Sequence, residues 1–389
     1  MCIGQNIFMI IPDYKGGSIV NLMSSITFAR GYKSKYDQLK LLKSKNLSKS
    51  KNVVLIIIDG LGYDFFVKHS KSKLLKKSLL GKITSVFPST TAAAISTYRT
   101  GLPPAEHGIV GWFQYFKAIG KVCVPLRFCV RGSEKRVNYN FLAGINPIFR
   151  FLKTDSMVLL PKLITKSKYT KELIGPAKVF PYSTVNGFFK QIKRLINLTN
   201  KKKYIYAYWP EFDSLCHEYG KNDKLSLKYY EALENKIELF LKSIKGTNTT
   251  VLITADHGQM QTSKQKMLKL NKYPDIKKTL SQPLSGEPRT VYCYVKNGKD
   301  KEFITAVNKN LKNKCQIFKS EDLIKKNFFG LDNINPKLKN RIGDYTLIMN
   351  DNYILKDFVK GEKRRFHLGN HGGVSSEETY VPLIYFNSK

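Results

Sequence analysis

Several polar side chains of this 389-residue sequence stand just after apolar runs that are typical of buried β-strands. Asp59 follows the run VVLIII, for example, and Asp256 follows VLITA. In an open parallel sheet, active sites form at the carboxyl ends of the strands, so we expect these side chains to converge there. The candidate set, completed by a histidine between glycines, is Asp59, Thr91, Asp213, His217, Asp256, His257 and His371.

The residue types in this set are suited to binding metal ions and transferring a phosphoryl group. Carboxylates and imidazoles are the ligands that Zn²⁺ prefers when thiolates are absent, and Mn²⁺ is an alternative. Two metal ions about 4 Å apart can hold the attacking and leaving oxygens of an in-line displacement. A threonine hydroxyl becomes a useful nucleophile when a metal lowers its pKa. Thr91 also lies where a helix is predicted to begin, and free backbone N–H groups there favour a phosphate.

Each of these residues also has a structural explanation. An aspartate after a buried strand is often only a helix N-cap. Asp213 and His217 lie four residues apart and could form a surface ion pair on one helical face, and His371 could be a turn residue. The set is more informative than its members, because most of its residues take the same position relative to their own strands.

Strands alternate with helices along most of the chain. Apolar runs predict strands at 53–58, 82–87, 204–209, 251–255 and 380–386, and a short strand or a lead-in at 7–11. Periodic or alanine-rich patterns predict helices at 18–30, 92–101 and 225–244. This alternation predicts an α/β fold with a mostly parallel, doubly wound sheet flanked by helices. Residues from about 110 to 200 fit it poorly, and we interpret them as a cap inserted into a single catalytic domain over 1–389.

Together these motifs resemble the alkaline phosphatase superfamily and, within it, the type I phosphodiesterase/nucleotide pyrophosphatase family. The resemblance rests on Asp59, FPSTTAAAISTYRTGLPPAEHGI at 87–109, DSLCH at 213–217, ADHG at 255–258 and NHGG at 370–373. These segments occur in the family's order and span most of the chain. The resemblance implies an alkaline phosphatase-like fold and hydrolysis of phosphodiester or pyrophosphate bonds in nucleotide-like substrates. It also implies a covalent intermediate of the phospho-threonine type.

The resemblance assigns roles to individual residues as well. The nucleophile is implied to be the threonine four residues after the phenylalanine of an FPxxT turn, which is Thr91 rather than Thr90. Two divalent metal ions are implied, and Thr91 would bind the second of them. The ligands of the first ion would be Asp213, His217 and His371. The other ligands of the second ion would be Asp59, Asp256 and His257.

Several residues leave the substrate open. Ala94 stands where we expect a phosphate-contacting asparagine from the resemblance, which puts a nucleotide substrate in doubt. Arg289 could touch a phosphate or simply be exposed. Four aromatic side chains could stack on a nucleobase or pack in the core: Trp112, Phe113, Tyr115 and Phe116. A phosphomonoesterase or phosphonate hydrolase of the same superfamily is therefore the enzymatic alternative.

The formal net charge of +37 raises the question of a polyanionic partner. The excess is mostly lysine and is spread along the whole chain, a pattern that a biased genome produces without such a partner. We therefore expect a small anionic phosphate ester as the partner rather than a dedicated nucleic acid. A basic nucleic-acid-binding protein on a catalytically dead scaffold is a further alternative, which the intact ligand positions argue against.

The remaining sequence features bear on location. The six cysteines are scattered and form no CxxC pair, which favours a reducing compartment. The N-terminal apolar stretch is short and lacks a basic region before it, unlike a signal peptide. No apolar run approaches the 18 or so residues that a membrane span requires. The sequence thus predicts a cytoplasmic protein.

Overall fold

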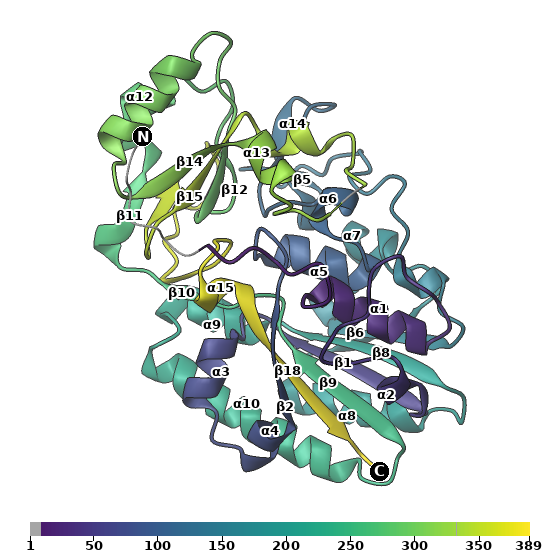
Figure 1. Ribbon diagram of the computed structural model, residues 1–389. Coiled ribbons are helices and arrows are strands. Elements are labelled where there is room, and N and C mark those ends of the chain that lie inside the picture. Colours follow the sequence, from purple (N-terminus) through teal and green to yellow (C-terminus); the bar gives the residue numbers. More distant parts are fainter. Residues whose placement is uncertain (1–8, 332) are drawn as a thin grey trace.

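The longest apolar runs of the sequence form the middle of a seven-stranded sheet in the lower part of Figure 1. The computed structural model describes residues 9–331 and 333–389. The strand order is β2-β18-β9-β1-β8-β6-β7. The strands are β1 (Asn52–Ile58), β2 (Leu79–Thr84), β6 (Asp155–Pro161), β7 (Lys178–Tyr182), β8 (Lys203–Trp209), β9 (Thr249–Thr254) and β18 (Tyr380–Asn387). β18 is antiparallel to both neighbours and the strands from β9 to β7 are parallel, so the predicted mostly parallel sheet is confirmed.

Both faces of the sheet are covered in its middle. Every residue of β1, β8 and β9 is buried, although successive side chains of a strand point to opposite faces. This burial explains why these strands are continuous apolar runs without alternation. The flanking helices are α1 (Ile19–Ala29), α3 (Tyr63–His69), α4 (Lys73–Ser78), α5 (Thr91–Thr100), α8 (Val185–Asn197), α9 (Glu211–Tyr219) and α10 (Lys224–Ser243).

Two of these helices are buried in different ways. α10 buries one stripe of side chains, including Tyr230, Leu233 and Ile237, and leaves its other side exposed, as its sequence period predicted. All ten residues of α5 are buried. α5 is therefore held on all sides, which fixes the position of Thr91 at its beginning.

A second, antiparallel sheet lies in the upper part of Figure 1 and was not expected from the sequence. Its order is β12-β13-β15-β14, and it has a hydrophobic core of its own. Its strands are β12 (Ser285–Gly286), β13 (Thr290–Cys293), β14 (Cys315–Lys319) and β15 (Tyr345–Met349). Helices α11 (Pro274–Lys277), α12 (Asp300–Asn310), α13 (Ser320–Lys325) and α14 (Leu338–Ile342) accompany it. The chain enters this unit after β9 and leaves it before β18.

The expected cap at 110–200 needs correction. Residues 155–197 contain β6, β7 and α8, and both strands belong to the central sheet. Only the part before β6 lies outside it, and this part forms a small sheet of β3 (Gln114–Phe116), β4 (Lys121–Val124) and β5 (Cys129–Val130). β7 was not predicted because it is a half-exposed edge strand that contains Pro181, a residue that edge strands tolerate.

Other expectations shift by a few residues. The strand expected at 82–87 runs from Leu79 to Thr84, and Ser18 is the N-cap residue of α1. The strand expected at 7–11 begins outside the described residues, and 9–11 form no strand. The short elements are α2 (Lys45–Ser48), α6 (Pro104–His107), α7 (Lys168–Glu172), α15 (Ser376–Thr379), β10 (Met260–Gln261), β11 (Met267–Lys269), β16 (Ile354–Lys356) and β17 (Gly369–Asn370). Within the described ranges, no helix combines the length and apolar character that crossing a bilayer demands.

A buried ion pair joins the second sheet to the segment before β18. Arg289 precedes β13 and donates through Nε and Nη2 to the two carboxylate oxygens of Glu378, at 3.0 and 2.8 Å. Glu378 also accepts hydrogen bonds from Gly373 N at 2.8 Å and Ser375 Oγ at 2.6 Å. Burial alone would raise the pKa of Glu378, but Arg289 and these donors outweigh it and lower the pKa. The carboxylate is thus charged and fully paired.

We predict that Arg289→Ala lowers the free energy of unfolding by about 3–5 kcal/mol, because Glu378 would keep a buried charge without its partner. Urea unfolding followed by circular dichroism measures this change. The control is Lys299→Ala, which removes an exposed pair with Glu302 and should leave stability almost unchanged. Equal effects of the two substitutions would contradict the role given to the buried pair.

Candidate active site

The carboxyl ends of β1, β8 and β9 meet at one edge of the central sheet. In the parallel register, Ile58 of β1 pairs with Trp209 of β8, and β9 ends one level earlier. Asp59 follows β1 directly, and Asp256 comes two residues after the end of β9. Asp256 Oδ1 accepts a hydrogen bond from Gly60 N at 3.1 Å, which joins the two strand ends.

Helix α9 begins two residues after β8 and carries Asp213 and His217 one turn apart. His217 Nε2 lies 3.2 Å from Asp213 Oδ2, and its Nδ1 lies 2.8 Å from the carbonyl oxygen of Gly369. A carbonyl oxygen only accepts, so Nδ1 carries a proton and donates it there. This hydrogen bond turns Nε2 towards the carboxylates, as is usual for a histidine that binds a metal.

The two adjacent threonines point to different partners. Thr91 is the first residue of α5, and its Oγ1 lies 3.0 Å from His257 Nε2. Thr90 is the N-cap residue, and its hydroxyl donates to Glu287 Oε1 at 2.6 Å. Only the Thr91 hydroxyl therefore faces the aspartates and histidines. It also stands at a helix N-terminus, whose first N–H groups have no partner within the helix.

His257 lies at the centre of the cluster. Its Nδ1 donates to the carbonyl oxygen of Gly258 at 2.9 Å, so its Nε2 faces the other side chains. Besides the contact with Thr91, Nε2 lies 3.3 Å from Asp59 Oδ1 and 3.4 Å from Asp256 Oδ2. One nitrogen thus faces three oxygens, an arrangement that a shared proton or cation stabilises.

The ring of His371 completes the cluster between the other two histidines. Its centroid lies 3.8 Å from that of His257, with the rings nearly parallel, and 5.1 Å from that of His217. Burial and the neighbouring His257 keep the pKa of His371 well below its usual range. His371 is therefore neutral and able to bind a metal.

The carboxylates and His257 influence each other's protonation. Burial and the neighbouring Asp213 raise the pKa of Asp59, and burial and Asp59 raise that of Asp256. Burial alone would lower the pKa of His257, but Asp256 and Asp59 outweigh it and raise the pKa to about 10. These pKa shifts have one cause, because buried carboxylates are stabilised by positive charge beside them.

The donor set fits divalent cations. Asp59 Oδ1, Asp256 Oδ2 and His371 Nδ1 are buried and have no hydrogen-bond partner among the described residues, which costs free energy unless something binds them. Two groups of side chains have ligand atoms within 4.8 Å of one another. The first is Asp213, His217 and His371, and the second is Asp59, Asp213 and His257. All seven predicted residues lie together in this cluster. Asp213 belongs to both groups, and in the second group it takes the place where Asp256 was predicted as a ligand. The division of ligands between two ions stays a prediction.

Sequence reasoning missed several side chains that support the cluster. The Tyr208 hydroxyl donates to Asp59 Oδ2, and the Gln259 amide donates to Asp213 Oδ1. The ring of His367 lies 4.4 Å from that of His217. Gln259 directly follows the segment ADHG, and Tyr208 lies inside the strand predicted at 204–209, which is the only signal that could have found them.

Ala94 and Arg289, whose relation to the substrate was left open by the sequence, are both buried away from solvent. Ala94 is completely buried in the main hydrophobic core and offers no polar group to a phosphate beside Thr91. Arg289 is neither exposed nor free for a phosphate, because it is paired with Glu378.

The aromatic segment after residue 111 is divided between the core and the surface. Phe116 is buried and stacks on Phe141 with ring centroids 4.1 Å apart. Trp112 and Phe113 are partly exposed, and Arg131 lies over the Phe113 ring at 4.0 Å.

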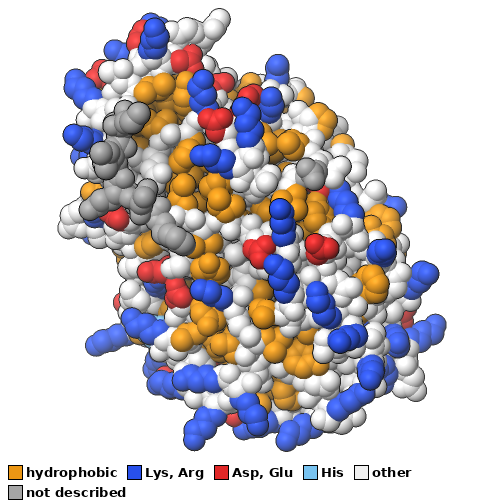
Figure 2. Space-filling model, in the orientation of Figure 1, with side chains coloured by type: hydrophobic (Ala, Val, Ile, Leu, Met, Phe, Trp, Pro, Cys, Tyr) orange, Lys and Arg blue, Asp and Glu red, His pale blue; other side chains and the backbone are white. Residues whose placement is uncertain are grey.

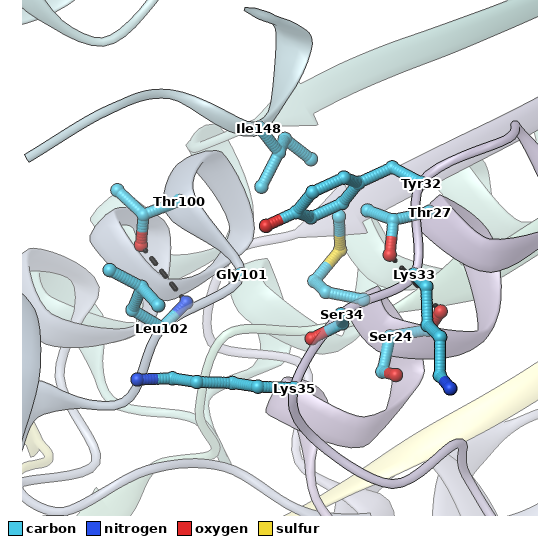
Figure 3. A pocket seen from close by; sticks show the side chains of 11 residues that line it. Ser24, Thr27, Tyr32, Lys33, Ser34, Lys35, Thr100, Gly101, Leu102 and Ile148 are labelled. Carbon is cyan, nitrogen blue, oxygen red and sulfur yellow. Dashed lines mark hydrogen bonds between the residues drawn. The ribbon is translucent and has the colours of Figure 1, made fainter. Parts of the chain in front are cut away.

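A cavity of about 340 Å³ lies at the opposite end of α5 from Thr91 (Figure 3). Tyr32, Lys35 and Ile148 are among the side chains that surround it, together with the C-terminal end of α5. None of the seven predicted residues lines it. The cavity is therefore separate from the candidate active site.

Comparisons with known proteins identify the family of this chain. A family model described as type I phosphodiesterase/nucleotide pyrophosphatase matches residues 53–374. Human ectonucleotide pyrophosphatase/phosphodiesterase family member 5 is 23% identical over 337 residues, which are 82% of this chain and 65% of that relative's length.

Two solved structures share the fold. The first is an inactive Thr→Ala variant of murine ectonucleotide pyrophosphatase/phosphodiesterase 5 in complex with AMP, at TM-score 0.67 and 19% identity, covering 85% of this chain and 87% of that one. The second is phosphonoacetate hydrolase from Sinorhizobium meliloti 1021 in complex with phosphonoformate, at TM-score 0.60 and 16% identity, covering 87% and 90%. The match of the family model over most of the chain decides the family. The protein belongs to the type I phosphodiesterase/nucleotide pyrophosphatase family.

Proposed function

We propose that this protein hydrolyses phosphodiester or pyrophosphate bonds in nucleotide-like substrates, with two divalent metal ions and with Thr91 as the nucleophile. The observation that carries the proposal is the position of Thr91 Oγ1, at the start of a buried helix and 3.0 Å from His257 Nε2. No other side chain of the cluster offers a hydroxyl at a helix N-terminus.

The residues of the cluster divide into ligands and supporting groups. Asp213, His217 and His371 would hold one ion, and the ligands of the other would come from Asp59, Asp256, His257 and Thr91. Bound ions would lower the pKa of the Thr91 hydroxyl and stabilise negative charge on the phosphoryl oxygens, and Zn²⁺ is the expected species, with Mn²⁺ the alternative.

The chain itself supplies orientation and a nucleophile. Thr91 Oγ1 would attack phosphorus and lose its proton to solvent, forming a phosphothreonine while the bond from phosphorus to the leaving oxygen breaks and that oxygen takes up a proton. Water would then attack the same phosphorus and release Thr91 with its proton restored. Backbone N–H groups at the start of α5 would bind the phosphoryl oxygens during both steps. Tyr208 and Gln259 hold the carboxylates of Asp59 and Asp213 in place.

The relatives support a nucleotide-like substrate and also an alternative. The murine relative is inactive as a Thr→Ala variant and forms a complex with AMP, which fits a threonine nucleophile and a nucleotide. Phosphonoacetate hydrolase shares the fold, so a phosphonate hydrolase or a phosphomonoesterase is the second candidate. The exposed lysines give little support to a nucleic-acid-binding role, because they are spread over most of the face shown in Figure 2. The cytoplasmic location stays a prediction.

The first prediction separates the two threonines. Thr91→Ala should reduce kcat about a thousandfold or more with the fold retained, because no other group can form the covalent intermediate. Thr90→Ala should cost far less, because Thr90 faces Glu287 and not the cluster. Steady-state kinetics at saturating metal, with circular dichroism as the folding control, measures both. If Thr90→Ala is inactive and Thr91→Ala keeps its kcat, the nucleophile assignment is wrong.

The second prediction concerns metal. Purified protein should contain close to two Zn²⁺ or Mn²⁺ per chain by plasma mass spectrometry, and a chelator should abolish activity reversibly. Asp213→Ala should lose more metal than His371→Ala, because Asp213 lies within both ligand groups. The matched control is Asp223→Ala, which removes a helix cap outside the cluster. Fully active protein without metal would end this proposal.

The third prediction concerns ester preference. Aryl or nucleotide diesters should have a higher kcat/KM than the matched monoesters, as the family suggests. A panel of diesters, monoesters and phosphonates, assayed under one set of conditions, measures the ratio. A monoester preferred tenfold, which is about 1.4 kcal/mol of transition-state stabilisation, would favour the second candidate instead.

A further inference from the structure

Glu287 is a buried carboxyl group that the proposed chemistry does not use. It stands between β12 and β13 of the second sheet and is 7% exposed. Its Oε1 accepts two hydrogen bonds, from Thr90 Oγ1 at 2.6 Å and from Trp112 N at 2.6 Å. The charged groups that act on it from nearby include His257 and His217 of the cluster and Lys356. Burying a carboxyl group costs free energy, so we expect the hydrogen bonds of Glu287 to serve a function.

The contact with Thr90 has an unusual consequence for α5. A threonine at the N-cap usually turns its side-chain oxygen to an N–H group of the first helical turn. Thr90 has the extended backbone of an N-cap residue, with φ −139° and ψ 149°, but its side chain forms no capping hydrogen bond. The hydroxyl instead donates to Glu287. The N–H groups at the start of α5 are thereby left without their usual local acceptor, next to the Thr91 hydroxyl.

Glu287 also contacts the loop that carries His371. A Cβ atom added at Gly372 would lie 2.6 Å from Glu287 Cβ, so the two residues touch and a larger residue would not fit. The same loop accepts hydrogen bonds from Thr290 Oγ1 to Gly372 O at 2.6 Å and from Ser89 Oγ to Gly373 O at 2.9 Å. The second sheet, the nucleophile turn and the His371 loop therefore meet at Glu287.

We infer that Glu287 is a positioning residue that holds the Thr90 hydroxyl away from the start of α5, so that the helix N–H groups stay free for the phosphoryl group of the substrate. This inference rests on the proposed function, with Thr91 as the nucleophile. Without Glu287, the Thr90 hydroxyl can rotate and cap α5. It would then compete with the substrate phosphate for the same N–H donors.

The test is a set of substitutions at positions 287 and 90, assayed with a nucleotide diester. Glu287→Ala should lower kcat/KM at least thirtyfold, with both a higher KM and a lower kcat. Glu287→Gln should keep most of the activity, because its amide oxygen can accept both hydrogen bonds. The control is Glu321→Ala, at an exposed pair with Lys339, which should behave as wild type.

The decisive variant is the double substitution. Removing the Thr90 hydroxyl from Glu287→Ala removes the competing cap, so Glu287→Ala/Thr90→Ala should regain at least tenfold over Glu287→Ala alone. A merely structural role predicts the opposite, with losses that add and a lower melting temperature. Should Glu287→Ala fail to fold, Glu287→Asp replaces it, because its carboxylate is one methylene shorter and loses the same contact.

Three outcomes distinguish a failure of this inference from a failure of the proposed function. An inactive Thr91→Ala with the double variant rescued supports both. An inactive Thr91→Ala with Glu287→Ala as active as wild type, or with no rescue by Thr90→Ala, overturns the inference alone. A fully active Thr91→Ala overturns the proposed function, and the role of Glu287 falls with it.

Discussion

The buried carboxylates of Asp59, Asp213 and Asp256 lie together at the ends of central strands, and their mutual repulsion is the constraint on which the site depends. Each buried charge costs several kcal/mol unless it is paired or binds a cation. The neighbouring side chains that can carry positive charge are three histidines, and His257 faces Asp59 and Asp256 with one nitrogen only. Such a cluster is stable when positive charge enters it, and divalent cations supply more of it than protons do. The same charge is what a phosphoryl group and an attacking hydroxyl require.

The remaining structure holds this cluster rigid. Parallel strands in register bring the aspartates to one level, and a wholly buried helix fixes Thr91 beside them. Hydrogen bonds from Nδ1 to backbone carbonyl groups turn His217 and His257 so that Nε2 faces inward. Because these supports come from backbone and core, the ligands are held in position before any metal binds, which limits the entropy lost on binding.

The parts of this site that could be predicted from the sequence are those that are local in the chain. Asp59 and Asp256 were found because a buried strand and the residue after it are read together, and Thr91 was found from its turn. β7 and the second sheet were not found, because β7 is a half-exposed edge strand and β13 is only four residues long. Short strands with few apolar residues look like loops, since their pairing depends on distant partners.

Supporting residues were missed because their partners lie far away in the sequence. Thr90 and Glu287 are 197 residues apart, and Arg289 reaches Glu378 across 89 residues. Both Glu287 and Arg289 stand in the same short turn, so one turn of the second sheet fixes the nucleophile segment and the segment before β18. The second sheet is therefore part of the framework of the active site rather than an addition beside it. A change in that turn would disturb the site without altering any metal ligand, which is why motifs alone describe this site incompletely.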